Sequence, residues 1–108
     1  MNLPTETFGH VIVVHAPEDL GADHADGFRN FCCGLDRSQV VLDLDGTESI
    51  DSEGLEALLD VQDELRRQGG ELKAATTNGY NRKILEITRL DQEIEVFGSV
   101  IEAAKSFR

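Results

Sequence analysis

Two short apolar runs constrain the fold of this chain more than any other feature. Val11–Val14 is a continuous β-branched run, and Val40–Leu44 is a second run of similar length. Runs of this kind are typical of strands that are buried on both faces of a sheet. A helix is predicted between them, over residues 22–34, from an apolar stripe of Ala25, Phe28, Cys32 and Leu35. Two buried strands joined by a helix form a right-handed crossover with parallel strands.

The rest of the chain adds elements to the same sheet. Residues 3–8 predict a short strand, which Pro4 restricts to an edge or a strand start. The best-marked helix is predicted over residues 52–68, with Gly69-Gly70 as its C-cap. Further predictions are a loop at residues 16–21, strands at residues 72–76 and 94–97, a helix at residues 81–89, and a last helix opened by Ser99 in a capping box with Glu102.

These elements predict one α/β domain over residues 1–108. The sheet is expected to be mixed and mostly parallel, with roughly four to five strands and about four helices packed on it. The sequence shows no internal repeat, linker or low-complexity segment.

The composition argues against several classes of protein. With 40% hydrophobic and 29% charged residues, the chain is expected to form one buried core in a soluble, cytoplasmic protein. No apolar run is long enough to span a bilayer, and residues 1–6 lack the pattern of a signal peptide. A net charge of −11 argues against nucleic acid as a partner. Cys32 and Cys33 lack the spacing of a disulfide, redox or zinc site, and are interpreted as small apolar residues of a helix.

Acidic residues are concentrated in the first half of the chain. Residues 1–54 hold eleven acids and two bases, a net charge of −9, whereas residues 55–108 have a net charge of −2. Such an excess favours either a partner with a basic docking surface or solubility alone, and the sequence leaves both readings open.

The stretch that follows the second apolar run carries two candidate functional motifs. Asp43-Leu44-Asp45-Gly46-Thr47 resembles the first motif of the haloacid-dehalogenase-like phosphatases, whose first Asp is a nucleophile and whose second is a general acid near Mg²⁺. The chain lacks the later Lys and acidic pair that this chemistry needs, and too few residues remain for another βαβ unit. Asp43 and Asp45 are therefore interpreted as turn acids, and no catalytic, metal or cofactor site is predicted.

The second candidate is Ser52, at the start of the long predicted helix. Either Asp51 or Ser52 can cap this helix by accepting hydrogen bonds from free backbone N–H groups. If Asp51 is the cap, the hydroxyl of Ser52 is exposed at a helix N-terminus, where an added phosphate meets a favourable dipole. Spacing alone leaves the two roles open.

An ordered set of motifs runs along almost the whole chain. The most specific is Asp51-Ser52-x-Gly54-Leu55 before an amphipathic helix. The others are Val40-Val41-Leu42-Asp43-Leu44, Leu65 with Gly69-Gly70-Glu71-Leu72, Ile84-Leu85-x-x-Thr88-x-Leu90-Asp91, and Val96-Phe97 with Ser99. In this order the motifs resemble the STAS domain family over about residues 10–107, and in particular the anti-sigma factor antagonists of bacteria.

This resemblance implies a regulatory protein-binding module, not an enzyme. In that family, the Ser at the position of Ser52 is phosphorylated by a partner kinase that is also an anti-sigma factor. The unphosphorylated form binds the kinase and frees the sigma factor, and a serine phosphatase resets the switch. The implied partner-binding residues are Asp51, Ser52, Glu53, Gly54, Leu55, Leu20 and Thr77.

Two departures from the family pattern keep an alternative open. The stretch Glu18-Asp19-Leu20-Gly21 keeps Leu20, but lacks the Gly and the final Asp that many members have after the second strand. Glu53 stands where Ser, Thr or Ala often follows the phosphorylated Ser, and its carboxylate, with that of Asp51, would repel an incoming phosphate. The alternative is a STAS scaffold or transporter-associated subunit that docks without phosphorylation. The sequence also leaves open whether the chain forms a homodimer.

Overall fold

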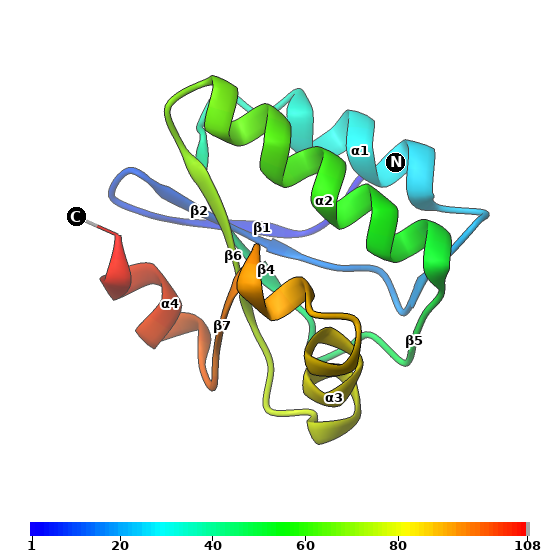
Figure 1. Ribbon diagram of the computed structural model, residues 1–108. Coiled ribbons are helices and arrows are strands. Elements are labelled where there is room, and N and C mark those ends of the chain that lie inside the picture. Colours follow the sequence, from blue (N-terminus) through cyan, green and yellow to red (C-terminus); the bar gives the residue numbers. More distant parts are fainter. Residues whose placement is uncertain (108) are drawn as a thin grey trace.

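Five strands form one mixed sheet in the computed structural model, which describes residues 1–107 (Figure 1). The strand order is β1-β2-β4-β6-β7, and every neighbouring pair is parallel except β1 and β2. The strands are β1 (Thr5–Phe8), β2 (Val11–His15), β4 (Gln39–Asp43), β6 (Glu71–Ala75) and β7 (Glu95–Phe97). The predicted mixed, mostly parallel sheet is therefore confirmed.

Helices cover the two faces of the sheet unequally (Figure 1). α1 (Ala25–Cys33) and α2 (Ser52–Arg67) pack against each other on one face, and α4 (Val100–Ser106) lies on the other. α3 (Gly79–Ile87) and the 3-10 helix η1 (Leu90–Gln92) connect β6 to β7. Within residues 1–107, no helix is both long and apolar enough to cross a membrane.

The central strands are buried on both faces, as their apolar runs predicted. Because side chains alternate along a strand, Leu42 of β4 packs into the larger core with Phe28 of α1. Its neighbour Val41 packs into the smaller core, with Val13 and with Ala103 of α4. The two cores hold the sheet rigidly between its helices, so the loops at the ends of its strands have fixed starting points.

The first helix is shorter than predicted. It begins at Ala25 instead of residue 22, and residues 22–24 form a turn in which the Gly21 carbonyl accepts hydrogen bonds from the N–H groups of His24 (3.0 Å) and Ala25 (2.8 Å). It ends at Cys33, with Gly34 as the C-cap, so Leu35 of the predicted stripe lies beyond the helix and packs against the core from a loop.

The other helix ends follow their capping residues. α3 begins at Gly79, earlier than predicted, because the side chain of Asn78 accepts hydrogen bonds from the N–H groups of Tyr80 and Asn81 in its first turn. Gly69 adopts a φ of 83°, which confirms the C-cap expected after α2. Ser99 caps α4 by accepting a hydrogen bond from the Glu102 N–H at 3.1 Å.

A second sheet of two strands was not predicted. β3 (Asp19–Leu20) and β5 (Ser49–Ile50) pair in parallel, although both stretches read as loops in the sequence. Strands of this length have too few residues to show a hydrophobic period. The small sheet lies at the start of α2 and brings the backbone of Leu20 against it.

A buried side chain completes the hydrogen bonding of β6. β7 pairs with β6 only from Lys73 onward, which leaves the preceding peptide groups of β6 without a strand on that side. Gln62 of α2 fills this place: its Nε2 donates to the carbonyls of Leu72 (3.0 Å) and Glu93 (2.7 Å), and its Oε1 accepts from the Leu72 N–H (2.7 Å). Gln62 therefore acts as a short extension of β7.

Candidate functional site

Asp51 is the N-cap of α2. Its Oδ1 accepts a hydrogen bond from the Gly54 N–H, and its Oδ2 accepts one from the Ala22 N–H, both at 3.0 Å. Hydrogen bonds to the ionised carboxylate, first from Gly54 and then from Ala22, lower the pKa of Asp51. Of the two capping roles that the sequence left open, Asp51 takes the cap.

Ser52 is left with a free hydroxyl. It is the first residue of α2, its side chain is exposed, and it makes no side-chain hydrogen bond within residues 1–107. Glu53, the next residue, is exposed as well. The hydroxyl of Ser52 therefore faces solvent at the positive end of the helix dipole, between two carboxylates.

Two glycines allow the start of α2 to lie directly on β3. A Cβ on Gly54 would overlap the carbonyl group of Leu20, and a Cβ on Gly21 would lie 2.6 Å from Oδ2 of Asp51. The same Leu20 carbonyl accepts a hydrogen bond from the Asp51 N–H at 3.2 Å. Cap, helix start and strand are thus packed backbone to backbone, with no room for a side chain between them.

Leu20 was expected on the partner-binding surface, and the structure corrects this. Its side chain is 0% exposed and lies in the larger core. Gly54 is also buried, Leu55 is half-buried, and Thr77 is exposed. Leu20 contributes to the site through its backbone, because an apolar side chain on a short strand beside the core turns inward.

Thr77 is tied to the acidic turn after β4. Oδ1 of Asp45 accepts hydrogen bonds from the N–H (2.6 Å) and the hydroxyl (3.1 Å) of Thr77. Oδ1 of Asp43 in turn accepts one from the Asp45 N–H at 3.0 Å. Both carboxylates are therefore engaged in the turn, as their interpretation as turn acids expects. In the described part of the chain, no group of three or more His, Cys, Asp and Glu side chains is placed to hold a metal ion.

The side chain of His15, at the C-terminal end of β2, contacts residues of β1 and β4, which was not predicted from the sequence. Its Nδ1 lies 2.8 Å from Oδ2 of Asp43, and its Nε2 lies 2.6 Å from Oε1 of Glu6. Burial alone would lower the pKa of His15, but the hydrogen bonds and negative charges of Glu6 and Asp43 outweigh it and raise the pKa. A signal was available, because the parallel register places His15 and Asp43, the last residues of their strands, side by side.

Asn81 fastens α3 to the loop between β4 and β5. Its Nδ2 donates to the carbonyls of Leu44 (3.1 Å) and Thr47 (2.8 Å), and the Thr47 hydroxyl donates to the carbonyl of Pro17 (2.9 Å). The side chains of Asn81 and Thr47 are both buried. The loops that follow β2 and β4 and the start of α3 are therefore held together as one unit beside the start of α2.

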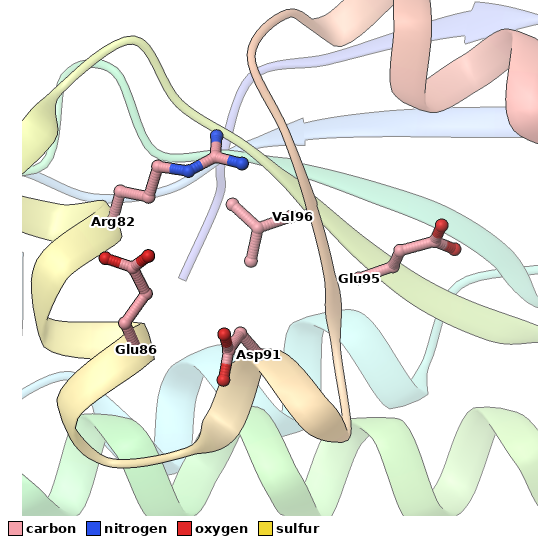
Figure 2. A pocket seen from close by; sticks show the side chains of 5 residues that line it. All are labelled: Arg82, Glu86, Asp91, Glu95 and Val96. Atoms are coloured by element: carbon pink, nitrogen blue, oxygen red, sulfur yellow. The ribbon is translucent and has the colours of Figure 1, made fainter.

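A separate polar pocket of about 210 Å³ lies between α3, η1 and β7 (Figure 2). Arg82 and Glu86 extend from α3 and Asp91 from η1 toward Val96 of β7, and Glu95 completes the lining. No residue of the predicted docking surface lines this pocket, so it is not part of the site.

We expect the stability that Asp51 contributes to be lost in acid. Its pKa in the folded state is lowered, so the contribution is complete above the unfolded-state pKa and disappears as the pH falls through the folded-state value. Asp51→Ala should lower the melting temperature at neutral pH and flatten the acid limb of its pH profile. Thermal unfolding followed by circular dichroism measures both. Asp23→Ala, which removes an exposed acid from the turn before α1, should leave the wild-type profile unchanged.

The opposite sign is expected for His15. Its pKa is raised in the folded state, so its contribution is complete below the unfolded-state pKa and is lost as the pH rises through the folded-state value. His15→Gln should remove this alkaline loss of stability, whereas the matched change His10→Gln, at an exposed turn, should retain it. An NMR titration that finds the pKa of His15 at or below the ordinary value for histidine would contradict the assignment.

Comparisons with known proteins agree with this architecture. A family model described as "STAS domain" matches residues 2–103. An anti-sigma factor antagonist from Mycobacterium paratuberculosis has a similar structure, with a TM-score of 0.85 and 18% identity over 97% of this chain and 92% of that one. A sulfate transporter family protein from Wolinella succinogenes has a TM-score of 0.78 and 16% identity over 95% of this chain and 85% of that one.

The Bacillus cell fate determinant SpoIIAA, in its phosphorylated form, has a TM-score of 0.73 and 15% identity over 99% of this chain and 100% of that one. No curated protein matches the chain significantly in sequence. At identities this low, the structural matches show a shared fold.

Proposed function

The chain belongs to the STAS domain family, and we propose that it is a regulatory protein that binds an anti-sigma factor serine kinase and is switched by phosphorylation of Ser52. One observation carries this proposal: Asp51 caps α2, while the hydroxyl of Ser52 stays exposed and unengaged. A kinase can therefore modify Ser52 without breaking the cap. The phosphorylated form of SpoIIAA supports a modification of this kind within the fold.

The surface around Ser52 is strongly acidic before any modification. Its exposed acids lie just before and on β3, on the loop after β4 and at the start of α2: Glu18, Asp19, Asp45, Glu48, Asp51 and Glu53. A partner that docks here needs basic groups opposite them. We propose that the docking surface consists of Asp51, Ser52, Glu53, Leu55 and Thr77, supported from below by the backbone of Leu20 and Gly54.

A phosphate on Ser52 changes this surface by charge. It adds about −1.5 to −2 charges at neutral pH, between the carboxylates of Asp51 and Glu53. A kinase also holds a nucleotide, whose phosphates must lie near the hydroxyl that they modify. After transfer, the phosphoserine and the bound nucleotide repel each other. We expect the complex to dissociate for this reason, and a serine phosphatase to restore binding.

The test is phosphorylation by the anti-sigma factor serine kinases of the source organism, with ATP and mass spectrometry. Wild type should gain one phosphate at Ser52, and Ser52→Ala should gain none. Ser49→Ala is the matched control, because Ser49 is exposed nearby on β5 and its hydroxyl donates to Asp19 at 2.6 Å. Ser52→Asp should weaken kinase binding at least about tenfold, the equivalent of 1.4 kcal/mol. An unmodified Ser52, together with unchanged binding of Ser52→Asp, would contradict the switch.

Glu53 favours a second candidate, a cytoplasmic scaffold or transporter-associated subunit that docks through the same surface without phosphorylation. The exposed carboxylate beside Ser52 opposes transfer of a phosphate to it, and the similarity to a sulfate transporter family protein supports this class. Glu53→Ala separates the two candidates. A switch protein should then be phosphorylated faster, whereas a scaffold should remain unmodified and should bind the same transporter components before and after the change.

A further inference from the structure

We propose that two copies of this chain associate by pairing their β1 strands antiparallel, across a two-fold axis at Thr7. β1 is an edge strand of the sheet, since β2 is its one neighbour in the strand order. An apolar groove lies beside it. This edge does not include the start of α2, so the association is independent of the proposed function.

The backbone of β1 offers hydrogen-bonding groups to a second strand. The His15 N–H donates to the carbonyl of Pro4 at 3.0 Å, and hydrogen-bonded pairs alternate along an antiparallel ladder. The peptide groups of Glu6 and Phe8 therefore face β2. Those of Thr5 and Thr7 point away from the sheet, toward the open edge.

β1 lacks the devices that usually block an open edge. Neither proline nor lysine lies within Thr5–Phe8, and the strand runs against β2 in a regular register without a bulge. Its one charged side chain, Glu6, is directed back over β2, where it binds Nε2 of His15. The edge is thus left open to another strand.

An apolar groove of about 410 Å³ lies next to this edge, between β1 and α4. It is lined by Phe8, Ile101, Ala104 and Lys105. Phe8 is 47% exposed and Ile101 is 61% exposed, so two large apolar side chains face solvent together. The hairpin of β1 and β2 and α4 lie toward the same side of the molecule in Figure 1.

A second copy that pairs with this edge also covers the side of the groove that Phe8 forms. With the axis at Thr7, the N–H of each Thr7 donates a hydrogen bond to the carbonyl of the other Thr7. Glu6 of the second copy then lies opposite Phe8, on the face of the sheet that carries α4, because the two side chains share that face. Lys105 lines the same groove as Phe8, and the second copy presents its Glu6 on this face of the sheet, where the Glu6 carboxylate already binds Nε2 of His15 in its own copy. An axis at Glu6 would instead set two carboxylates against each other.

Salt should strengthen this association. Each copy has a net charge of −11, so two copies repel one another over long range, and added salt screens that repulsion. An ion pair between Lys105 and Glu6 would be exposed and would contribute little free energy, so its screening by salt should have little effect on the association.

Sedimentation equilibrium of the whole chain tests the proposal. The average mass of the wild type should rise from one chain toward two between about 1 μM and 1 mM, and the rise should begin at lower concentration in higher salt. Ile101→Lys places a charge in the groove and should weaken the dimer at least about tenfold. Ile87→Lys is the matched control: Ile87 is 71% exposed on α3, and the wild-type association should persist.

Thr7→Pro supplies a second variant, because it removes the outward N–H at the axis while the bonds of Glu6 and Phe8 to β2 remain. It should be monomeric, with a far-ultraviolet circular dichroism spectrum like that of the wild type. A wild type that stays monomeric throughout the concentration range would overturn the proposal. So would equal weakening by Ile101→Lys and Ile87→Lys, or a Thr7→Pro variant that is folded and still dimeric.

Discussion

Gly54→Ala is expected to lower the free energy of unfolding by about 2–3 kcal/mol, although alanine is the better helix former. The added methyl group would overlap the carbonyl group of Leu20, which is backbone and cannot rotate away. The start of α2 can make room only by moving off β3. That movement lengthens the hydrogen bond from the Asp51 N–H to the Leu20 carbonyl and disturbs the two bonds made by the Asp51 carboxylate.

Urea unfolding measures this loss, and Gly79→Ala is its matched control. Gly79 lies in the first turn of α3, where an added Cβ meets no atom within 4 Å. There the same substitution should be neutral, or stabilising by up to about 1 kcal/mol through helix propensity. A loss of stability in Gly54→Ala, without a loss in Gly79→Ala, would show that the close approach to Leu20 decides the effect. Equal effects would contradict the packing described for α2.

Gln62→Leu is expected to cost about 3 kcal/mol of stability. The substitution keeps a side chain of similar size, so it leaves no large cavity. It removes the partner of the Leu72 N–H and the Gln62 donor of the Leu72 carbonyl, at the end of β6 that β7 does not reach. The Glu93 carbonyl also loses Gln62 but still accepts a hydrogen bond from Arg66 at 2.9 Å. Each buried polar group that loses its partner costs about 1–3 kcal/mol, and the apolar side chain offsets a part of this.

Gln68→Leu makes the same substitution at an exposed position just after α2. Among residues 1–107 the side chain of Gln68 hydrogen-bonds only to Glu64, at 3.0 Å on the surface, so the change should stay within about 0.5 kcal/mol. Hydrogen exchange provides a local measurement. In Gln62→Leu the amide of Leu72 should exchange faster than in the wild type. An unchanged rate at Leu72 would mean that Gln62 does not stabilise that end of β6.

Strands and helices with a clear apolar pattern, either a continuous run or a helical stripe, could be predicted from the sequence. Val11–Val14 and Val40–Leu44 are uninterrupted enough to indicate buried parallel strands, and both lie in the centre of the sheet. β3 and β5 could not be predicted, because two residues carry no period and their pairing joins segments far apart in the chain. Leu20 was misplaced for the same reason. Without β3, an apolar residue in a loop reads as exposed.

The roles of Asp51 and Ser52 also depended on tertiary structure. Capping preferences treat Asp and Ser as near equals, so the sequence left the choice open. Asp51 is favoured by a second donor, the N–H of Ala22, which lies 29 residues earlier in the chain. His15 was overlooked because its partners come from two other strands, although the strand order would have placed Asp43 beside it.

The two-residue pairing of β3 with β5 has a consequence for motion at the start of α2. Few backbone hydrogen bonds hold this small sheet, among them the bond from the Glu48 N–H to the Glu18 carbonyl at 2.7 Å. Segments with so few bonds open at a much lower free energy than the core strands. Opening here would break the bond from the Asp51 N–H to the Leu20 carbonyl and the bond from the Ala22 N–H to the Asp51 carboxylate, and it would withdraw the Leu20 side chain from the core. The bond from the Gly54 N–H to Asp51 lies within α2 and would remain. A charge added at Ser52 then acts on a local equilibrium between closed and open forms, and its effect is limited by how differently it stabilises the two. Any response at this surface therefore depends on how firmly the two-residue ladder and the buried Leu20 side chain hold the start of α2.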